Sequence, residues 1–211
     1  TPGHADFAFE VSRSLAACQG ALLLVDAAQG IQAQTIATFF LAMERDLAII
    51  PVANKIDSVN ADVEGTGEQL ESVFGIDASE LVPISAKVGT NVAKVLDAVV
   101  ERVPAPSGDA SPTARLRALL LDCHYDPYRG AVASVAIVDG AVKIGDKIRS
   151  MRTGSVSEVL ELGLMTPEPL KVSELTAGRV GYVITSQRDV RAAKIGDTLV
   201  LERDHQKSLN D

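Results

Sequence analysis

The sequence has little of several features that would each define a class of protein. Its 211 residues include two cysteines, Cys18 and Cys123, too few for a disulfide framework and in keeping with a reducing compartment. We expect Cys18, in an Ala-rich apolar stretch, to lie in the core. The longest apolar runs, such as 21–25, are far shorter than the roughly 18 residues that a membrane-spanning helix needs, so any membrane association is expected to be peripheral. With 46% hydrophobic and 23% charged residues, the composition excludes disorder and indicates one or two globular domains.

Positive charge is scarce in the first half of the chain. Residues 1–109 carry 6 Lys and Arg against 15 Asp and Glu, a net charge of −9, whereas residues 110–211 carry 14 against 13, a net charge of +1. An acidic surface is a poor non-specific ligand for nucleic acid, and no DNA partner is expected. The first residue is Thr1, and no signal-peptide pattern follows it, so we expect a mature, truncated or partial chain.

The first half alternates continuous apolar runs with helix-like segments. Apolar strands separated by helices are typical of a parallel sheet that is covered on both faces. The predicted helices are 5–18, 31–45, 62–74 and 91–102, and the predicted strands are 20–27, 47–53 and 81–84.

The pattern changes in the segment VPAPSGDASP at 103–112, whose prolines and small polar residues indicate a linker. Short strands broken by turn signals follow, which predicts a small antiparallel β-barrel. Asp139-Gly140 predicts a hairpin turn. The tetrapeptide Lys-Ile-Gly-Asp occurs twice, at 143–146 and 194–197, and each copy places a Gly-Asp turn just before a predicted strand. The predicted strands are 116–123, 131–138, 146–151, 157–162, 179–185 and 197–201. The expected domains are 1–103 and 116–205, with a linker at 104–115.

The motif Asn54-Lys55-Ile56-Asp57 directly follows the buried strand at 47–53. A loop at the carboxyl end of a parallel strand faces the ligand crevice. The Asp57 carboxylate can accept hydrogen bonds from N1–H and the exocyclic amine of guanine, a pair that adenine lacks, and such a site can discriminate by about 10⁴-fold. The Asn54 amide can brace the loop, and the Lys55 stem can lie along the ring. The alternative is a solvated turn, because four-residue motifs recur by chance.

Ser85-Ala86-Lys87 follows the strand at 81–84 in the same way. A backbone N–H there can donate to the guanine O6 atom, and the Lys87 stem can flank the base. Taken alone, the motif is no more than a helix-entry turn. Because it comes one strand after Asn-Lys-x-Asp, the two together favour a guanine-nucleotide site.

Thr1-Pro2-Gly3-His4 opens the chain just before a predicted helix. Gly3 would let the backbone approach a phosphate and bind a terminal phosphoryl oxygen through its N–H group. His4 could orient an attacking water, as phosphoryl transfer requires. An exposed helix-entry turn is the alternative. His124 and His205 have no metal-ligand spacing, and no metal site is expected.

In this order, TPGHADF, NKID and SAK resemble the third, fourth and fifth nucleotide motifs of the translational GTPases. EVSRSLAACQGALLLVDAAQGIQAQT, SAKVGTNV, ERVPAP and DPYRGAVASV extend the resemblance over nearly the whole chain, to the elongation factor 4 family (LepA type). Factors of the elongation factor G and BipA types are similar in architecture, but different residues are expected around 10–14 and 126–130. The resemblance implies the α/β fold of a partial P-loop GTPase domain, with helices on both faces of a parallel sheet, and a translation-factor-type antiparallel β-barrel after it. It also implies a ribosome-bound GTPase that acts in back-translocation or translation fidelity.

The resemblance assigns roles position by position. Asn54, Lys55 and Asp57 match the guanine-reading motif, with Ser85, Ala86 and Lys87 as its companion. Gly3, within the nucleotide-binding segment Thr1-Pro2-Gly3-His4, matches the residue that meets the γ-phosphate, and His4 matches the catalytic histidine. The cofactors implied are GTP and Mg²⁺. The glycine-rich phosphate loop, the first switch and the magnesium ligands of the family are expected upstream of Thr1, so the chain is expected to be an internal fragment that is inactive alone.

The implied partners are GTP and GDP, ribosomal RNA and small-subunit proteins, with peripheral membrane association as a further possibility. GIQAQT and FFLAMERD favour an organellar form in the mitochondrial matrix, on or near the inner membrane, and the alternative is the bacterial cytoplasm. Two rival classes stay open. One is a non-hydrolysing GTPase-like binding module, and the other is a small Ras-like or ribosome-assembly GTPase, which shares NKID and SAK but lacks a barrel.

Overall fold

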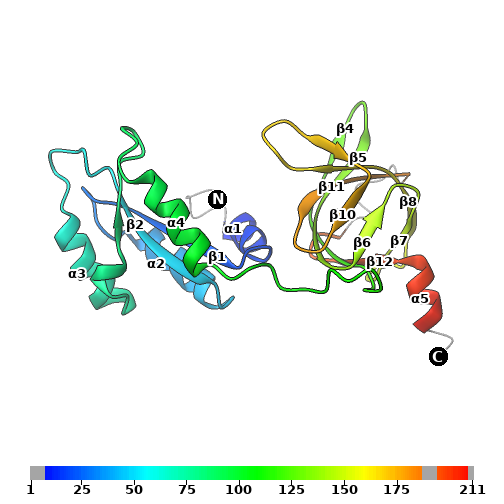
Figure 1. Ribbon diagram of the computed structural model, residues 1–211, viewed down its shortest axis with the longest axis horizontal. Coiled ribbons are helices and arrows are strands. Elements are labelled where there is room, and N and C mark those ends of the chain that lie inside the picture. The colour runs from blue at the N-terminus through cyan, green and yellow to red at the C-terminus, as the bar shows by residue number, and fades with distance from the viewer. Residues whose placement is uncertain (1–7, 187–193, 209–211) are drawn as a thin grey trace. The chain divides into compact units, whose positions relative to one another are not determined.

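The computed structural model describes residues 8–186 and 194–208 (Figure 1). It divides into two compact units, residues 1–105 and residues 106–211. Among the described residues, no helix is long and apolar enough to cross a membrane.

Over residues 8–105, unit 1 is an α/β layer built on three parallel strands in the order β1-β2-β3. The predicted elements are all found in its described part, with ends that shift by a few residues. In chain order they are α1 (Ala8–Leu15), β1 (Gly20–Asp26), α2 (Ala33–Met43), β2 (Ala48–Asn54), α3 (Val63–Phe74), the short 3₁₀ helix η2 (Ala78–Glu80), β3 (Val82–Pro83) and α4 (Val92–Arg102).

Helices lie on both faces of this sheet, as the continuous apolar strands predict, although Leu22 and Leu24 of β1 stay exposed on one of them. On one face, Ile50 and Val52 of β2 pack against Val95 and Ala98 of α4, which Figure 1 shows in front of the strands. On the other face, Leu23 and Val25 of β1 pack with one residue from α2 and one from α3, namely Phe39 and Leu70. Ile50, Val52 and Leu70 are wholly buried, so apolar burial on both sides fixes the sheet and the position of its strand ends.

The loop after β1 is tied to α3. The N–H of Asp62 donates to the carbonyl of Ala27 at 2.8 Å, and its side chain caps α3 by accepting the N–H of Gly65 at 2.8 Å. One turn further on, the Gln69 side chain accepts the N–H of Ile31 at 2.9 Å. These bonds hold the β1–α2 loop beside the strand ends.

Cys18 is exposed, and the expectation of a core cysteine is wrong. Helix α1 ends at Leu15, three residues before the predicted end of the helix at 18. Cys18 therefore lies in the connection to β1, where its Sγ contacts the carbonyl of Ser14 at 3.2 Å. Val11 and Leu15 provide the buried face of α1 instead.

In the part of unit 2 that the structure describes, six antiparallel strands form a closed barrel. The order is β11-β5-β4-β12-β7-β8, and the pairing of β11 with β8 closes it. These six are the strands that the sequence predicts, while three short strands and a terminal helix were not predicted. The elements are β4 (Arg117–Asp126), β5 (Gly130–Asp139), β6 (Ala141–Lys143), β7 (Lys147–Ser150), β8 (Val156–Leu164), β9 (Leu170–Val172), β10 (Glu174–Thr176), β11 (Val180–Thr185), β12 (Thr198–Leu201) and α5 (Glu202–Ser208).

The two Lys-Ile-Gly-Asp phrases form the same turn. In each, the aspartate N–H donates to the lysine carbonyl three residues earlier, at 3.1 Å for Asp146 and 3.0 Å for Asp197. Gly145 and Gly196 have φ values of 87° and 81°, a region that glycine enters without a steric penalty. The strands that follow, β7 and β12, pair with each other, so the prediction of a turn before each strand is confirmed.

The prediction of a hairpin at Asp139-Gly140 is wrong. Strand β5 pairs with β4 and β11, whereas β6 pairs with β10, so the chain turns a corner here and leaves its sheet. The corner is built on the preceding segment. Asp139 accepts the N–H of Asp109 at 2.8 Å and the Arg117 guanidinium at 2.7 Å, and the N–H of Gly140 donates to the Asp109 carbonyl at 2.7 Å.

Candidate functional site

The carboxyl ends of β1, β2 and β3 meet at one edge of the unit 1 sheet. In the parallel register, Asp26 at the end of β1 lies opposite Asn54 at the end of β2, and Ala53 lies opposite Pro83 of β3. The segments that continue from β2 and β3 carry NKID and SAK. They are joined by a backbone hydrogen bond from the N–H of Ile56 to the carbonyl of Ile84, 3.2 Å long.

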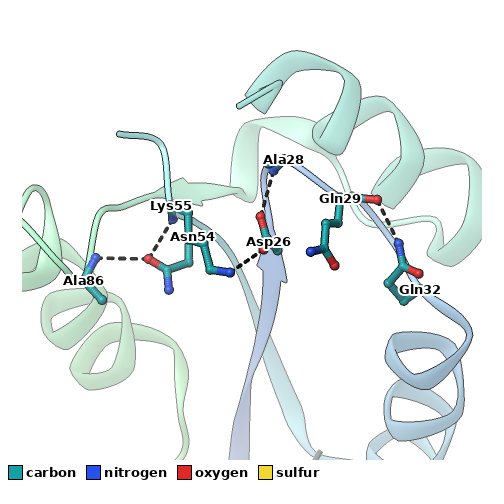
Figure 2. Close-up of polar contacts among 7 residues, drawn as sticks. All are labelled: Asp26, Ala28, Gln29, Gln32, Asn54, Lys55 and Ala86. Carbon is teal, nitrogen blue, oxygen red and sulfur yellow. Dashed lines mark hydrogen bonds and ion pairs between the residues drawn. The ribbon is translucent and has the colours of Figure 1, made fainter. Parts of the chain in front are cut away.

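Asn54 braces both segments, as predicted for its amide. Its Oδ1 atom accepts the N–H of Lys55 at 2.8 Å and the N–H of Ala86 at 3.0 Å (Figure 2). One side-chain oxygen thus fixes the NKID loop and the SAK loop in a common geometry. It also occupies the Ala86 N–H, which is a candidate donor to the base.

Asp57 is held by Ser85. Ser85 is 1% exposed as a residue. Its hydroxyl donates to Oδ1 of Asp57 at 2.7 Å and accepts the N–H of Val88 at 3.1 Å. The hydrogen bond from Ser85 is the main reason that the pKa of Asp57 is lowered, and the charge of Lys87 adds to it while desolvation opposes it. The carboxylate is therefore ionised at neutral pH and aimed by a buried neighbour, although Asp57 itself is exposed.

Lys55 spans from the end of β2 to the end of β1. Its backbone φ is 65°, a left-handed conformation that costs a non-glycine residue of the order of 1 kcal/mol. Its Nζ atom forms an ion pair with Oδ2 of Asp26 at 2.6 Å. Oδ1 of Asp26 accepts the N–H of Ala28 at 2.9 Å, and Figure 2 shows the side chains of Lys55 and Asp26 pointing toward each other. The lysine hydrogen bond, followed by that of Ala28, lowers the pKa of Asp26.

The structure thus brings together six of the ten residues that the sequence proposes for nucleotide binding. They are Asn54, Lys55, Asp57, Ser85, Ala86 and Lys87. Thr1, Pro2, Gly3 and the catalytic candidate His4 lie outside the described residues. The sequence reasoning missed Asp26, for which the available signal is a lone acid at the end of a predicted strand. Among the described residues, no cluster of His, Cys, Asp or Glu could hold a metal ion.

Comparison with known proteins agrees with this geometry. Residues 1–105 match the family of the elongation factor Tu GTP binding domain. Elongation factor 4 of Exiguobacterium sibiricum is 55% identical over 203 residues, which is 96% of this chain. The chain belongs to the elongation factor 4 family. Among other members, the mitochondrial translation factor GUF1 homologue of Physcomitrium patens is 56% identical over 201 residues, or 94% of the chain.

The match to the elongation factor 4 family covers only part of each relative. The chain spans 33% of the Exiguobacterium protein and 29% of the Physcomitrium protein. A solved structure, the bacterial selenocysteine-specific elongation factor EF-Sec, is similar with a TM-score of 0.74 at 22% identity, over 96% of this chain and 34% of that one. At this identity it supports the fold alone, an α/β unit and a barrel. The fold class expected from the sequence is confirmed.

Proposed function

We propose that this chain carries the guanine-reading part of a translational GTPase that acts on the ribosome, in back-translocation or translation fidelity. The observation that carries the proposal is the hydrogen-bonded set of Asn54, Asp57 and Ser85 at one sheet edge. An ionised carboxylate held at one angle can accept both N1–H and the exocyclic amine of guanine. With adenine, the same carboxylate would meet no such donor pair and would lose its hydration without compensation.

The NKID and SAK motifs are proposed to make different contacts with the guanine base. Asp57 reads the donor edge, Asn54 keeps the two loops in register, and the stems of Lys55 and Lys87 flank the ring. Since the Ala86 N–H already donates to Asn54, contact with O6 requires this N–H to be shared or the next N–H, of Lys87, to donate. The guanine base therefore fits the described residues. GTP would supply the phosphoanhydride bond that is cleaved, with Mg²⁺ bound by groups beyond the described part of the chain.

The chemical step is assigned to His4, which we propose orients the attacking water while Gly3, in the segment that begins with Thr1 and Pro2, donates its N–H to the terminal phosphate. The 211-residue chain alone is expected to bind GTP weakly. Asn54, Asp57 and Lys87 address the uncharged end of the nucleotide, and residues 1–109 carry a net charge of −9, which repels the triphosphate at long range.

The partners proposed are ribosomal RNA and small-subunit proteins, bound by the barrel, with no DNA. Peripheral membrane contact is a lesser proposal. We place the protein in the mitochondrial matrix, with the bacterial cytoplasm as the alternative; bacterial and plant mitochondrial relatives are equally similar, at 55% and 56% identity. An elongation factor G or BipA type is disfavoured by the names of the relatives. The barrel disfavours a small Ras-like GTPase.

The test uses a chimaera in which this chain replaces the matching segment of the elongation factor 4 of Aquifex aeolicus, 55% identical over 199 residues. We expect the chimaera to bind GTP in preference to ATP and to hydrolyse GTP faster when ribosomes are added. His4→Ala should slow ribosome-stimulated hydrolysis far more than it weakens GTP binding. Binding of GTP without stimulated hydrolysis would support the binding-module alternative, and equal binding of ATP and GTP would refute the proposal.

A further inference from the structure

The ion pair between Lys55 and Asp26 links the base-reading loop to a second loop that no motif marks. The lysine is fixed at both ends, since its N–H donates to Asn54 at 2.8 Å and its Nζ lies 2.6 Å from Asp26. The Asp26 side chain is 19% exposed and the Lys55 side chain 59% exposed. The pair therefore sits at the rim of the strand ends, with the anion on the more buried side.

Asp26 is itself held in place by the turn that ends β1. Its Oδ1 atom accepts the N–H of Ala28 at 2.9 Å, and its carbonyl accepts the N–H groups of Gln29 at 3.0 Å and Gly30 at 2.8 Å. A carboxylate anchored in this way can act as a fixed point for a flexible lysine. Figure 2 shows it facing the Lys55 ammonium across the edge of the sheet.

We propose that Asp26 is a positioning residue for the base site, which holds the Lys55 stem in the orientation that walls the guanine ring. The proposal rests on the proposed function. A free lysine stem has many rotamers, and a ligand must order them when it binds. Because Asp26 already holds the ammonium group, the Lys55 side chain is ordered before guanine binds, and less side-chain conformational entropy is lost on binding.

Asp26→Asn tests this in the chimaera. Asparagine has the same size and keeps an oxygen for the Ala28 N–H, but it carries no charge for Lys55. Exposed ion pairs make small contributions, so we expect the Kd for a fluorescent GDP in Mg²⁺ buffer to rise about threefold at low salt. The rise should become smaller but stay detectable in about 1 M salt, because the screening length there is roughly 3 Å and the two charges lie 2.6 Å apart. An unchanged or lower Kd at low salt would overturn the proposal.

Asp139→Asn is the matched control. Asp139 pairs with Arg117 at 2.7 Å, its side chain is 22% exposed, and it lies in the barrel. Like Asp26, it also accepts a backbone N–H. This variant should leave the GDP affinity of the chimaera unchanged at every salt concentration. If it weakened GDP as much as Asp26→Asn does, the effect would come from general destabilisation, and the positioning role would be wrong.

A double-mutant cycle separates positioning from support of the turn. Lys55→Met keeps an apolar stem and removes the ammonium, so Asp26→Asn should have no further effect on GDP binding in the Lys55→Met background. The same threefold loss in both backgrounds would show that Asp26 acts through its turn, and would overturn the proposal. In the 211-residue chain, carbon NMR titration should show that Lys55→Met raises the pKa of Asp26; an unchanged pKa would refute the ion pair.

The experiment distinguishes a failure of the Asp26 positioning role from a failure of the proposed guanine-reading function. If the unmodified chimaera binds GDP and ADP equally, guanine reading itself fails. If it prefers GDP and Asp26→Asn changes nothing, only the positioning role fails.

Discussion

Replacing Ser85 with alanine removes the group that aims Asp57. The hydroxyl is buried, donates to Asp57 at 2.7 Å and accepts the Val88 N–H at 3.1 Å. Two hydrogen bonds at about 0.5–1.5 kcal/mol each give about 1–3 kcal/mol. Val88 is 67% exposed, so water can replace part of what is lost. We therefore expect Ser85→Ala to lower the free energy of unfolding of unit 1 by about 1–2 kcal/mol.

The same substitution should move the titration of Asp57. Its folded-state pKa lies below the ordinary value of 3.8, chiefly because of the Ser85 hydroxyl. A lowered folded pKa contributes stability that is present above the unfolded pKa and is lost as the pH falls through the folded value. Ser85→Ala should raise the pKa of Asp57 and make unit 1 less sensitive to acid. Guanine preference in the chimaera should fall as well, because the carboxylate is no longer aimed.

Ser150→Ala is the matched control for this experiment. Ser150 is also buried, donates to the carboxylate of Asp197 and accepts a backbone N–H, that of Thr153, at 3.1 Å. We expect a similar loss of stability confined to the barrel, with the Asp57 pKa and nucleotide preference unchanged. The chain has no tryptophan, so unfolding in urea would be followed by amide hydrogen exchange and methyl NMR signals from each unit. If the pKa of Asp57 were unchanged in Ser85→Ala, the proposal that Ser85 orients and stabilises the Asp57 carboxylate would be wrong.

Three further predictions concern packing, reactivity and domain limits. A Cβ atom at Gly163 would lie 2.1 Å from the ring of Tyr182, so Gly163→Ala should destabilise the barrel by about 1–3 kcal/mol in urea unfolding; unchanged stability would show that the ring is free to move. A maleimide should label Cys18 well before Cys123, because Cys18 is exposed and burial raises the pKa of the Cys123 thiol; equal rates would contradict this burial. Limited proteolysis should cut within the predicted linker at 104–115, whose residues are mostly exposed, and release the barrel, whereas cuts spread through the strands would refute the predicted domain limits.

Much of the fold follows from apolar periodicity alone. The run around Ile50 is continuous because both faces of β2 are covered, whereas in the run around Leu23 the neighbours Leu22 and Leu24 are exposed. The parallel order of the strands places NKID and SAK at one edge. What the sequence does not show is which strands pair over long distances. The closure of the barrel by β11 and β8 and the partner of each three-residue strand depend on the whole fold, since three residues are too few for a pattern.

The residues of the candidate site that stand in a sequence motif could be predicted, whereas a residue outside any motif could not. Asn54, Asp57 and Ser85 stand in recognisable motifs at strand ends, and the structure joins them. Asp26 carries no motif, because its partner Lys55 lies 29 positions away and is brought near by strand register. The hairpin predicted at Asp139-Gly140 is wrong for a related reason, which is a contact with a residue distant in sequence. Its turn residues match a hairpin, yet contacts with Asp109, from the preceding segment, direct the chain elsewhere.

The central claim, that this sheet edge reads guanine, is tested most directly by Asp57→Asn in the chimaera. The asparagine amide presents one donor and one acceptor, which match the 2-oxo edge of xanthine instead of the two donors of guanine. Competition binding should show GTP affinity lowered at least about a hundredfold, within the discrimination such a pair can provide, and xanthosine triphosphate affinity raised. GTP bound as tightly as before, with no gain for xanthosine triphosphate, would contradict the assignment of Asp57.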